Sequence, residues 1–404
     1  MDLKKFRKDF PILTKENKFI YFDNAASSLK PIQVIQKIDS YYNEFPVNIH
    51  RGLHHLSMQA SIIYDDTRKK VSNFINCNPD EVVFTQNATD AINLLMYMLY
   101  NSNFFKKGDE IIISVYEHHS NLVPWQFLSN KLGLNLKVVD IDKNYNFDIL
   151  DCQKKLTNKT KLVAIAHASN TIATISPINE IIELSHEKGA LVLIDGSQSI
   201  PHFSFDFKKT GCDFLAFTCH KMLGPTGVGC LISKKKFLER FSPVRFGGDM
   251  IKSVSLEKSE WNNIPYKFEA GTPNISGIFG LGAAIDYLNM VGLDNIEKHD
   301  KELLEYGLEN IQKVKEIELY NPLDINKQGP IILFSLGNND PQKINILLDE
   351  ISGIAVRSGM HCAQPIVSRL NPNGLLRASF YFYNTFEEID VFIKTLKDIQ
   401  KKFL

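Results

Sequence analysis

Short apolar runs alternate with amphipathic stretches up to about residue 220. Uninterrupted runs of Val, Ile, Leu and Phe are typical of strands covered on both faces, whereas the stretches between them have helical spacing. The expected strands are Phe19–Phe22, Glu81–Thr85, Glu110–Ser114, Leu136–Asp140, Lys161–Ala166, Leu191–Ile194 and Phe214–Phe217. The expected helices include Ile32–Asn43, Ser61–Asn76, Asp90–Leu99 and Ile178–Lys188. This alternation predicts an α/β fold around a mostly parallel sheet.

The pattern changes near residue 289. Two helical segments, Ile278–Leu288 and Leu293–Val314, lead into a smaller α+β pattern. Its expected elements are Ile331–Leu336, Pro341–Ile351, Ala355–Arg357, Leu375–Phe380 and a final helix that begins at Thr385 with the Thr385–Glu388 spacing of a capping box. Because 404 residues exceed what one core usually serves, we expect two domains. They are a large α/β domain (20–288) and a small α+β domain (289–404), on which residues 1–19 pack.

Two polar residues follow neighbouring strands. Asp195 ends the run Leu191–Ile194, and Lys221 comes just after the run Phe214–Phe217. In open α/β sheets, ligands bind at the carboxyl ends of the strands, so both side chains are expected at one crevice. A carboxylate and an amine there suit pyridoxal 5'-phosphate (PLP), which forms a Schiff base with a lysine and needs an acid at its pyridine nitrogen. Taken singly, each residue is equally consistent with an ordinary strand end.

Other motifs leave alternatives open. The segment Gln86–Thr89 lies between a strand and a helix, where a phosphate binds or where Asn87 or Thr89 simply caps the helix. His118 follows a strand and suits stacking on a flat cofactor or a solvated loop. The histidines of Val47–Ser57 suit a pocket wall better than a metal site, because no cysteine or carboxylate stands beside them at ligand spacing.

Composition narrows the class of protein. The chain has 46 basic and 46 acidic residues, which gives no reason to expect a nucleic-acid or membrane partner. The N-terminus lacks the apolar stretch of a secretory signal, and no run is long enough to span a bilayer. The six cysteines are scattered without metal spacing, which indicates reduced thiols. We expect no metal and a cytoplasmic location, or an organelle if a targeting segment lies outside this sequence.

Seven segments, in order, resemble the motifs of one enzyme family. They are DNAASSLKP (23–31), HRGLHHLS (50–57), EHHSNLVPW (117–125), VLIDGSQS (192–199), TCHKMLGPTGVG (218–229), FEAGTPN (268–274) and AVRSGMHCAQP (355–365). The chain resembles PLP-dependent enzymes of the aspartate aminotransferase fold (fold type I), class V. Within that class it is most similar to cysteine desulfurases of the group II SufS/CsdA type. The resemblance implies a large domain with a mostly parallel central sheet and a smaller α+β domain.

The resemblance also implies roles for individual residues. Lys221 would carry PLP and move protons, Asp195 would pair with the ring nitrogen, and His118 would stack on the ring. The remaining cofactor contacts would come from Gln198, Asn170, Ala88, Thr89, Thr218 and His220, and from Thr272 of a partner copy, which implies a homodimer. The substrate pocket would be formed by Arg377, which holds the substrate carboxylate, and by His50, Arg357, Asn24, Ala25 and Ala26.

Cys362 selects the reaction in this resemblance. Its thiolate would take the sulfur of L-cysteine as a persulfide and leave L-alanine, with sulfur passed on to a SufE/SufU-type acceptor or a scaffold for iron–sulfur cluster assembly. Selenocysteine lyase, another class V aminotransferase or epimerase, and a PLP-binding docking protein remain alternatives. The sequence departs from the family at Met360, where His is common, at Ala173, where Gly is usual, at Gln86–Thr89 and at Asp249.

Overall fold

The structure is a computed structural model that describes residues 3–14 and 19–403. Its helices are α1 (Leu3–Arg7), α2 (Ile32–Glu44), α3 (His55–Ile75), α4 (Ala88–Asn101), α5 (Val123–Leu132), α6 (Ile149–Lys155), α7 (Ile178–Glu187), α8 (Phe207–Thr210), α9 (Lys235–Arg240), α10 (Ile275–Val291), α11 (Leu293–Ile311), α12 (Pro341–Ser352), α13 (Gln364–Leu370) and α14 (Phe386–Phe403). Its strands are β1 (Ile20–Tyr21), β2 (Val82–Thr85), β3 (Glu110–Ser114), β4 (Asn135–Val139), β5 (Thr160–Ala166), β6 (Leu191–Asp195), β7 (Phe214–Thr218), β8 (Gly229–Ser233), β9 (Ile251–Val254), β10 (Ser259–Trp261), β11 (Ile317–Leu319), β12 (Ile331–Leu336), β13 (Ile354–Ala355), β14 (Arg357–Gly359) and β15 (Leu375–Ser379).

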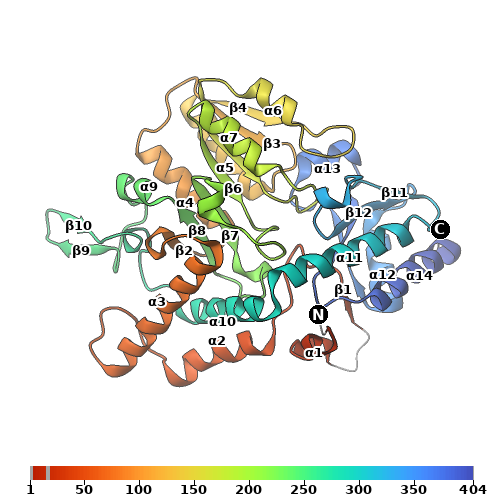
Figure 1. The fold of residues 1–404 in the computed structure, drawn as a ribbon, viewed down its shortest axis with the longest axis horizontal. Helices are drawn as coiled ribbons and strands as arrows, with labels where there is room; N and C mark the ends of the chain where they lie inside the picture. The colour runs from red at the N-terminus through yellow and green to blue at the C-terminus, as the bar shows by residue number, and fades with distance from the viewer. Residues whose placement is uncertain (1–2, 15–18, 404) are drawn as a thin grey trace.

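A seven-stranded sheet forms the centre of the larger part of the molecule (Figure 1). Its strand order is β2-β8-β7-β6-β5-β3-β4, and only β8 pairs antiparallel with its neighbours. Successive residues of its strands face two different cores: Ile112 belongs to one, while Ile111 and Ile113 belong to the other. Burial on both faces explains the uninterrupted apolar runs of the sequence. The expected α/β fold with a mostly parallel sheet is confirmed.

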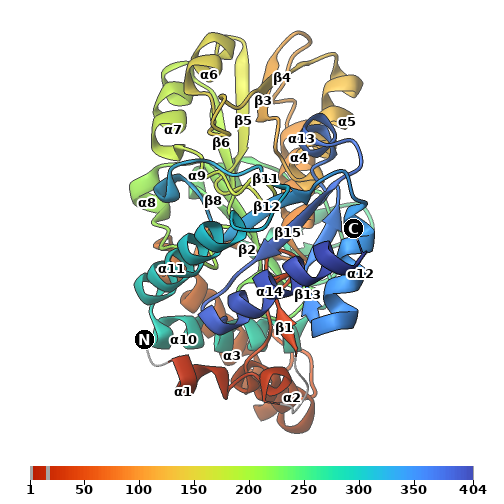
Figure 2. The same cartoon turned by 90° about the vertical axis from the view of Figure 1, so that its right-hand side faces the viewer.

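A second sheet lies in the C-terminal part of the chain, facing the viewer in Figure 2. Its order is β11-β12-β15-β14, all antiparallel. This sheet and helices α11, α12 and α14 enclose a third core. The N-terminal segment contacts this part, since Arg7 pairs with Glu388 at 2.8 Å and Phe10 packs on Tyr383. The bounds 20–288 and 289–404 stay a prediction, and expectations for residues 1–2 and 15–18 lie outside the described residues.

Several elements differ from those expected. Helix α3 begins at His55, six residues before the expected Ser61, because the His54 ring accepts a hydrogen bond from Ser57 N and caps the helix. The expected strand Ala355–Arg357 is divided into β13 and β14, which pair with different partners. The hairpin β9–β10, strand β11 and helix α13 were not expected. The hairpin extends from the body of the molecule (Figure 1), so no buried face marks its sequence.

The carboxyl ends of β5, β6 and β7 open toward the second sheet. The N-terminus of α4 lies beside them, because β2 leads directly into that helix. Among the described residues, no single helix is long and apolar enough to cross a membrane; α10 and α11 satisfy length and composition only as a pair bent by 74°. Residues 275–291 of that pair are mostly buried in the protein core.

Candidate active site

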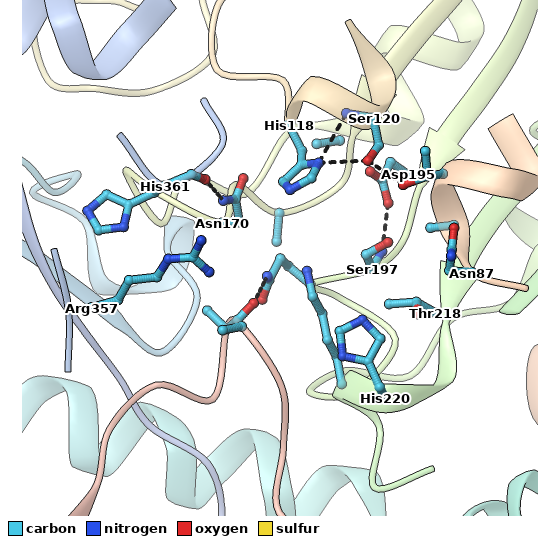
Figure 3. A pocket seen from close by; sticks show the side chains of 18 of the residues that line it. Asn87, His118, Ser120, Asn170, Asp195, Ser197, Thr218, His220, Arg357 and His361 are labelled. Atoms are coloured by element: carbon cyan, nitrogen blue, oxygen red, sulfur yellow. Dashed lines mark hydrogen bonds between the residues drawn. The ribbon is translucent and has the colours of Figure 1, made fainter. Parts of the chain in front are cut away.

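A cavity of about 380 Å³ lies where the strand ends meet the second sheet. Its walls come from segments far apart in the sequence, as Figure 3 shows for ten labelled residues. The residues of the sequence hypothesis that line it are Ala25, Ala26, Ala88, Thr89, His118, Asn170, Asp195, Gln198, Thr218, His220, Lys221, Arg357 and Arg377. The fold therefore brings most of the proposed site residues to one place.

Asp195 and Lys221 face this cavity from neighbouring strand ends. The Asp195 carboxylate accepts a hydrogen bond from Ser197 N at 2.9 Å and is nearly buried. Lys221 ends the short 3-10 turn Cys219–Lys221 that follows β7. Burial, with Arg377 and Arg357 nearby, lowers the pKa of the Lys221 amine to about 8, although Asp195 opposes this shift. An amine with this pKa is partly neutral at physiological pH and can act as a nucleophile.

One end of the cavity is rich in hydrogen-bond donors. Asn87 caps helix α4 through a bond from Asp90 N, so the first turn of this helix presents free backbone N–H groups beside Ala88. The hydroxyls of Ser197 and Thr218 are buried and have no hydrogen-bond partner. Figure 3 shows Asn87, Ser197 and Thr218 on the same side of the cavity. Buried donors without a partner fit an anionic group such as a phosphate.

His118 lies in the wall between the two ends of the cavity. Its Nδ1 accepts a hydrogen bond from Ser120 N at 3.1 Å, which leaves the proton of the neutral ring on Nε2. Burial and the nearby charge of Lys221 lower the pKa of His118 to about 3. The ring is therefore neutral at physiological pH, as stacking on an electron-poor aromatic ring requires. Ser120 also bonds to Thr89 at 2.6 Å and so connects this wall to α4.

The other end of the cavity carries two arginines. Arg377, on β15, is 1% exposed and donates to Asp23 and to the Asn170 carbonyl, each at 2.8 Å. Its Nε has no partner. The Asn170 amide in turn donates to the His361 carbonyl at 2.7 Å. A buried guanidinium with spare donors can hold a small carboxylate by two parallel bonds.

Cys362 lies beside this end of the cavity. Its sulfur is 3.9 Å from Nη2 of Arg357, which lines the cavity with His361. The loop that carries it has left-handed backbone at both His361 and Cys362, and the Cys362 carbonyl accepts a bond from His119 N at 2.7 Å. The guanidinium is placed to balance a negative charge on the sulfur.

Four residues of the sequence hypothesis do not line the cavity of this chain: Cys362, which lies beside it, and Asn24, His50 and Thr272. The Asn24 amide bonds to the Ser379 carbonyl and to Asn384 instead. His50 faces Asp65 at 3.7 Å in a separate cavity, and Thr272 accepts a bond from Asn48 at 3.3 Å. Thr272 lines an adjoining cavity with Asn87, which also lines the main one.

The sequence hypothesis missed several residues of the cavity. Ser120 and Ser197 follow His118 and Asp195 by two positions each. This closeness to proposed site residues is the feature of the sequence that could have identified them. A further missed group is Glu117, a buried carboxylate held by Ala166 N at 3.0 Å and Asn121 at 2.7 Å. Burial raises the pKa of Glu117 to about 7. It does not line the cavity but bonds to the last residue of β5, and in the sequence only the neighbouring histidines drew notice.

The donor set fits PLP. A carboxylate, an amine and unpartnered hydroxyls beside a helix N-terminus match its ring nitrogen, aldehyde and phosphate in turn. Within residues 3–14 and 19–403, no group of three or more His, Cys, Asp or Glu side chains could hold a metal ion.

Comparison with known proteins gives a consistent result. The family model for class V aminotransferases matches residues 20–392. A probable cysteine desulfurase of Halalkalibacterium halodurans is 43% identical over 407 residues, covering 100% of this chain and 99% of that protein. The solved cysteine desulfurase of Thermococcus onnurineus NA1 superposes with a TM-score of 0.94 at 39% identity, over 98% of each chain. Escherichia coli cysteine desulfurase CsdA gives a TM-score of 0.92 at 30% identity, over 100% of each chain.

These relatives are matched over nearly their whole length, and their likeness extends through the segments that form the cavity. The chain therefore belongs to the class V aminotransferase family and, within it, to the PLP-dependent cysteine desulfurases.

Proposed function

We propose that the protein converts L-cysteine to L-alanine and keeps the sulfur as a persulfide on Cys362. The observation that carries the proposal is the position of the Cys362 sulfur, 3.9 Å from Arg357, beside a cavity that also contains Lys221, Asp195 and Arg377. The carbon–sulfur bond of the substrate breaks, a sulfur–sulfur bond forms on Cys362, and protons return to the carbon skeleton of the product. Atoms and electrons balance: the sulfur that alanine lacks is held in the persulfide, and the two electrons lost by the pair of sulfur atoms reduce the β-carbon of the substrate to the methyl group of alanine.

Different residues of the cavity have different roles in this reaction. PLP, when bound, supplies an aldehyde carbon for amines and a ring that withdraws electrons from the substrate. Asp195 holds a proton at the ring nitrogen, and the first turn of α4 with Ser197 and Thr218 binds the phosphate. Arg377 orients the substrate carboxylate. Lys221, whose pKa is lowered to about 8 by burial, can accept and return protons near neutral pH.

The destination of the sulfur is also part of the proposal. A persulfide on a partly exposed loop can be attacked by a thiol of another protein, so a SufE/SufU-type acceptor or a scaffold for iron–sulfur cluster assembly is the proposed recipient. The chain would act in the cytoplasm as a SufS-like enzyme. All six cysteines are free, which fits a reducing compartment.

We further propose that the enzyme works as a homodimer. Apolar side chains just before and in the first part of α3 are strongly exposed in the single chain, with Leu53 at 93%, Met58 at 55% and Ile62 at 58%. A second copy covering this surface would bury them. His50 precedes Leu53 closely in the sequence, and Thr272 bonds to the nearby Asn48 at 3.3 Å. In a homodimer, the partner's Thr272 and the partner's His50 would therefore complete the cofactor and substrate sites.

The test is to incubate the protein with L-cysteine and a reductant and to measure alanine and sulfide. We expect one alanine for each sulfide. Cys362→Ser should abolish sulfide release and keep the cofactor absorbance band, whereas Cys152→Ala, at a buried thiol on α6, should change neither. A sulfur added to the Cys362 peptide, detected by mass spectrometry, would support the proposal; comparable sulfide release by Cys362→Ser would refute it.

A further inference from the structure

The carbonyl oxygen of His220, the residue before Lys221, is surrounded by donors. It accepts hydrogen bonds from Lys30 Nζ at 2.8 Å, Ser28 N at 3.0 Å, Ser27 Oγ at 3.1 Å and Ser28 Oγ at 3.2 Å. A carbonyl oxygen has two lone pairs, so four donors are more than an ordinary backbone position attracts. This oxygen belongs to the peptide bond that joins His220 to Lys221. The bonds therefore fix the backbone that carries the lysine.

The same segment also holds the chain after Lys221. Leu223 N donates to Ser28 Oγ at 2.9 Å. Ser28 therefore contacts the backbone at positions 220 and 223, on both sides of the lysine. A lysine in a short 3-10 turn has little regular structure to hold it, so these side contacts decide where its amine points.

Lys30 differs from the serines because it brings a charge. All three acceptors of its ammonium are neutral oxygens, those of Ser27 Oγ, the Ser28 carbonyl and the His220 carbonyl. Burial lowers the pKa of Lys30 to about 8. Its charge is also one of the causes, after burial and Lys221, that lower the pKa of His220 to about 4. Burying a cation without a carboxylate partner costs folding free energy. Stability therefore does not explain the position of Lys30, which indicates another role.

The loop that carries Lys30 is itself firmly held. Ala25 N donates to Ser379 Oγ at 2.9 Å, and Leu29 N donates to the Tyr383 hydroxyl at 2.8 Å. Gln198, which lines the cavity, donates to the Ala25 carbonyl at 2.8 Å. The segment 23–31 thus has fixed points on the second sheet and on the loop after β6, and it presents Lys30 to the lysine turn from a rigid support.

We propose that Lys30 is a positioning residue for Lys221, holding the His220–Lys221 peptide with a charge-assisted hydrogen bond and setting a positive charge behind the PLP-bearing turn. This inference rests on the proposed role of Lys221 as the lysine that binds PLP. It does not depend on which amino acid is the substrate. The serines of the segment share the geometric part of this role, and only Lys30 supplies the charge.

The experiment compares Lys30→Met, Lys30→Arg and Lys154→Met in the PLP-loaded full chain. Lys154 is an exposed lysine on α6 and serves as the matched control. The first readout is the pH midpoint of the absorbance change of the lysine-bound cofactor. Loss of a nearby positive charge favours the protonated cofactor linkage, so Lys30→Met should raise this midpoint by about half a pH unit or more. Lys30→Arg keeps the positive charge, so its midpoint should stay close to that of the unaltered protein, and Lys154→Met should show no shift.

The second readout is turnover of L-cysteine. Lys30→Met should lower kcat by about tenfold and leave KM within about twofold, because misplacement of a reacting amine affects the chemical step while Arg377 still binds the substrate. A Lys30→Met protein that is merely less stable to heat, with an unchanged spectral midpoint and kcat, would overturn the proposal. So would an equal effect of Lys30→Arg and Lys30→Met.

A milder variant covers the case in which Lys30→Met does not fold. Ser27→Ala removes one donor from the His220 carbonyl and keeps the charge, so kcat should fall by severalfold with the spectral midpoint unmoved. An unchanged kcat in Ser27→Ala would overturn the geometric part. If the unaltered protein released no sulfide, the proposed function would be refuted. The proposal for Lys30 would still be tested, because the spectral titration of its variants does not require cysteine.

Discussion

At the scale of single residues, Lys221 shows how the surroundings of a side chain change its chemistry. Its pKa is lowered to about 8 by burial, against an ordinary value near 10.5. The direction follows because burial and the arginines disfavour the charged form. At pH 7, about 10% of the amine is then neutral, compared with well under 0.1% for an ordinary lysine.

We therefore expect Lys221, like Lys30, whose pKa is also lowered to about 8, to react at lower pH than the exposed lysines when PLP has been removed. Competitive labelling with acetic anhydride, followed by peptide mass spectrometry, should give a reactivity midpoint near pH 8, with labelling increasing as the pH rises. Exposed lysines such as Lys154 provide the internal reference. A midpoint for Lys221 above pH 10 would contradict this prediction.

Arg377 supports a second prediction at this scale. Arg377→Lys keeps the charge but loses the planar fork that fits a carboxylate. Hydrogen bonds to charged groups contribute about 1.5–3 kcal/mol each, so loss of one should lower kcat/KM for cysteine by roughly 10- to 100-fold. The cofactor absorbance band should persist, because Arg377 is placed at the substrate end. Steady-state kinetics with the spectrum as control tests this, and an unchanged kcat/KM would remove Arg377 from the substrate site.

The sequence anticipated residues of the cavity wherever a motif ends a strand, as with Asp195 and Lys221. It could not separate Asn24 from Ala25, because adjacent residues of one motif point in different directions once Ser379 and Asn384 engage the Asn24 amide. Ala173, where the family usually has Gly, adopts a φ of 62°. The left-handed backbone explains the preference for Gly, and only coordinates reveal it.

At the scale of elements, strand β8 and helix α4 approach unusually closely. A Cβ atom added at Gly229 would lie 2.6 Å from the backbone of Asn87, the residue that caps α4. Because a backbone atom cannot move aside like a flexible side chain, Gly229→Ala must displace the start of α4.

We expect Gly229→Ala to weaken cofactor retention and to destabilise the fold by about 1–3 kcal/mol, the usual cost of overpacking. Dialysis against cofactor-free buffer and thermal unfolding measure the two effects. Gly189→Ala is the control for adding a methyl group, since nothing lies within 4 Å of its Cβ position, although its φ of +74° brings backbone strain of its own. Retention of PLP equal to that of the unaltered protein would show that the phosphate end tolerates the displacement.

Strands and helices of the central sheet could be predicted because burial on two faces leaves continuous apolar runs. Helix α13 and hairpin β9–β10 could not. The first is short and follows a loop with left-handed residues, and the second is mostly exposed, with Leu256 at its turn fully accessible. Short elements and elements without a buried face carry little periodic signal.

At the scale of the whole molecule, a buried hydrogen bond between a histidine and an aspartate joins distant segments. His202, after β6, lies 2.6 Å from Asp300 on α11, and both side chains are almost inaccessible. The His202 ring also packs on Tyr381, just beyond β15, at a centroid distance of 4.9 Å. Burial raises the pKa of Asp300, while His202 opposes that shift.

His202→Phe leaves the buried Asp300 carboxyl group without its hydrogen-bond partner, so we expect it to destabilise the fold by at least about 1–3 kcal/mol. The double variant His202→Phe/Asp300→Leu removes both polar groups and should recover much of that loss. Urea unfolding of the two single variants and the double variant measures the coupling. Strictly additive effects would show that the pair does not stabilise the junction of the segments.

The contacts of segment 23–31 have a consequence for the synthesis of the enzyme on the ribosome. Its bonds from Ala25 to Ser379 and from Asp23 to Arg377 each join residues 354 positions apart. Asp23 and Ala25 are synthesised long before Arg377 and Ser379 leave the ribosomal exit tunnel. A nascent chain that already contains the central sheet therefore still lacks the contacts that hold segment 23–31, behind Lys221, on the second sheet. We therefore expect the support of segment 23–31 to be complete only when synthesis is almost finished.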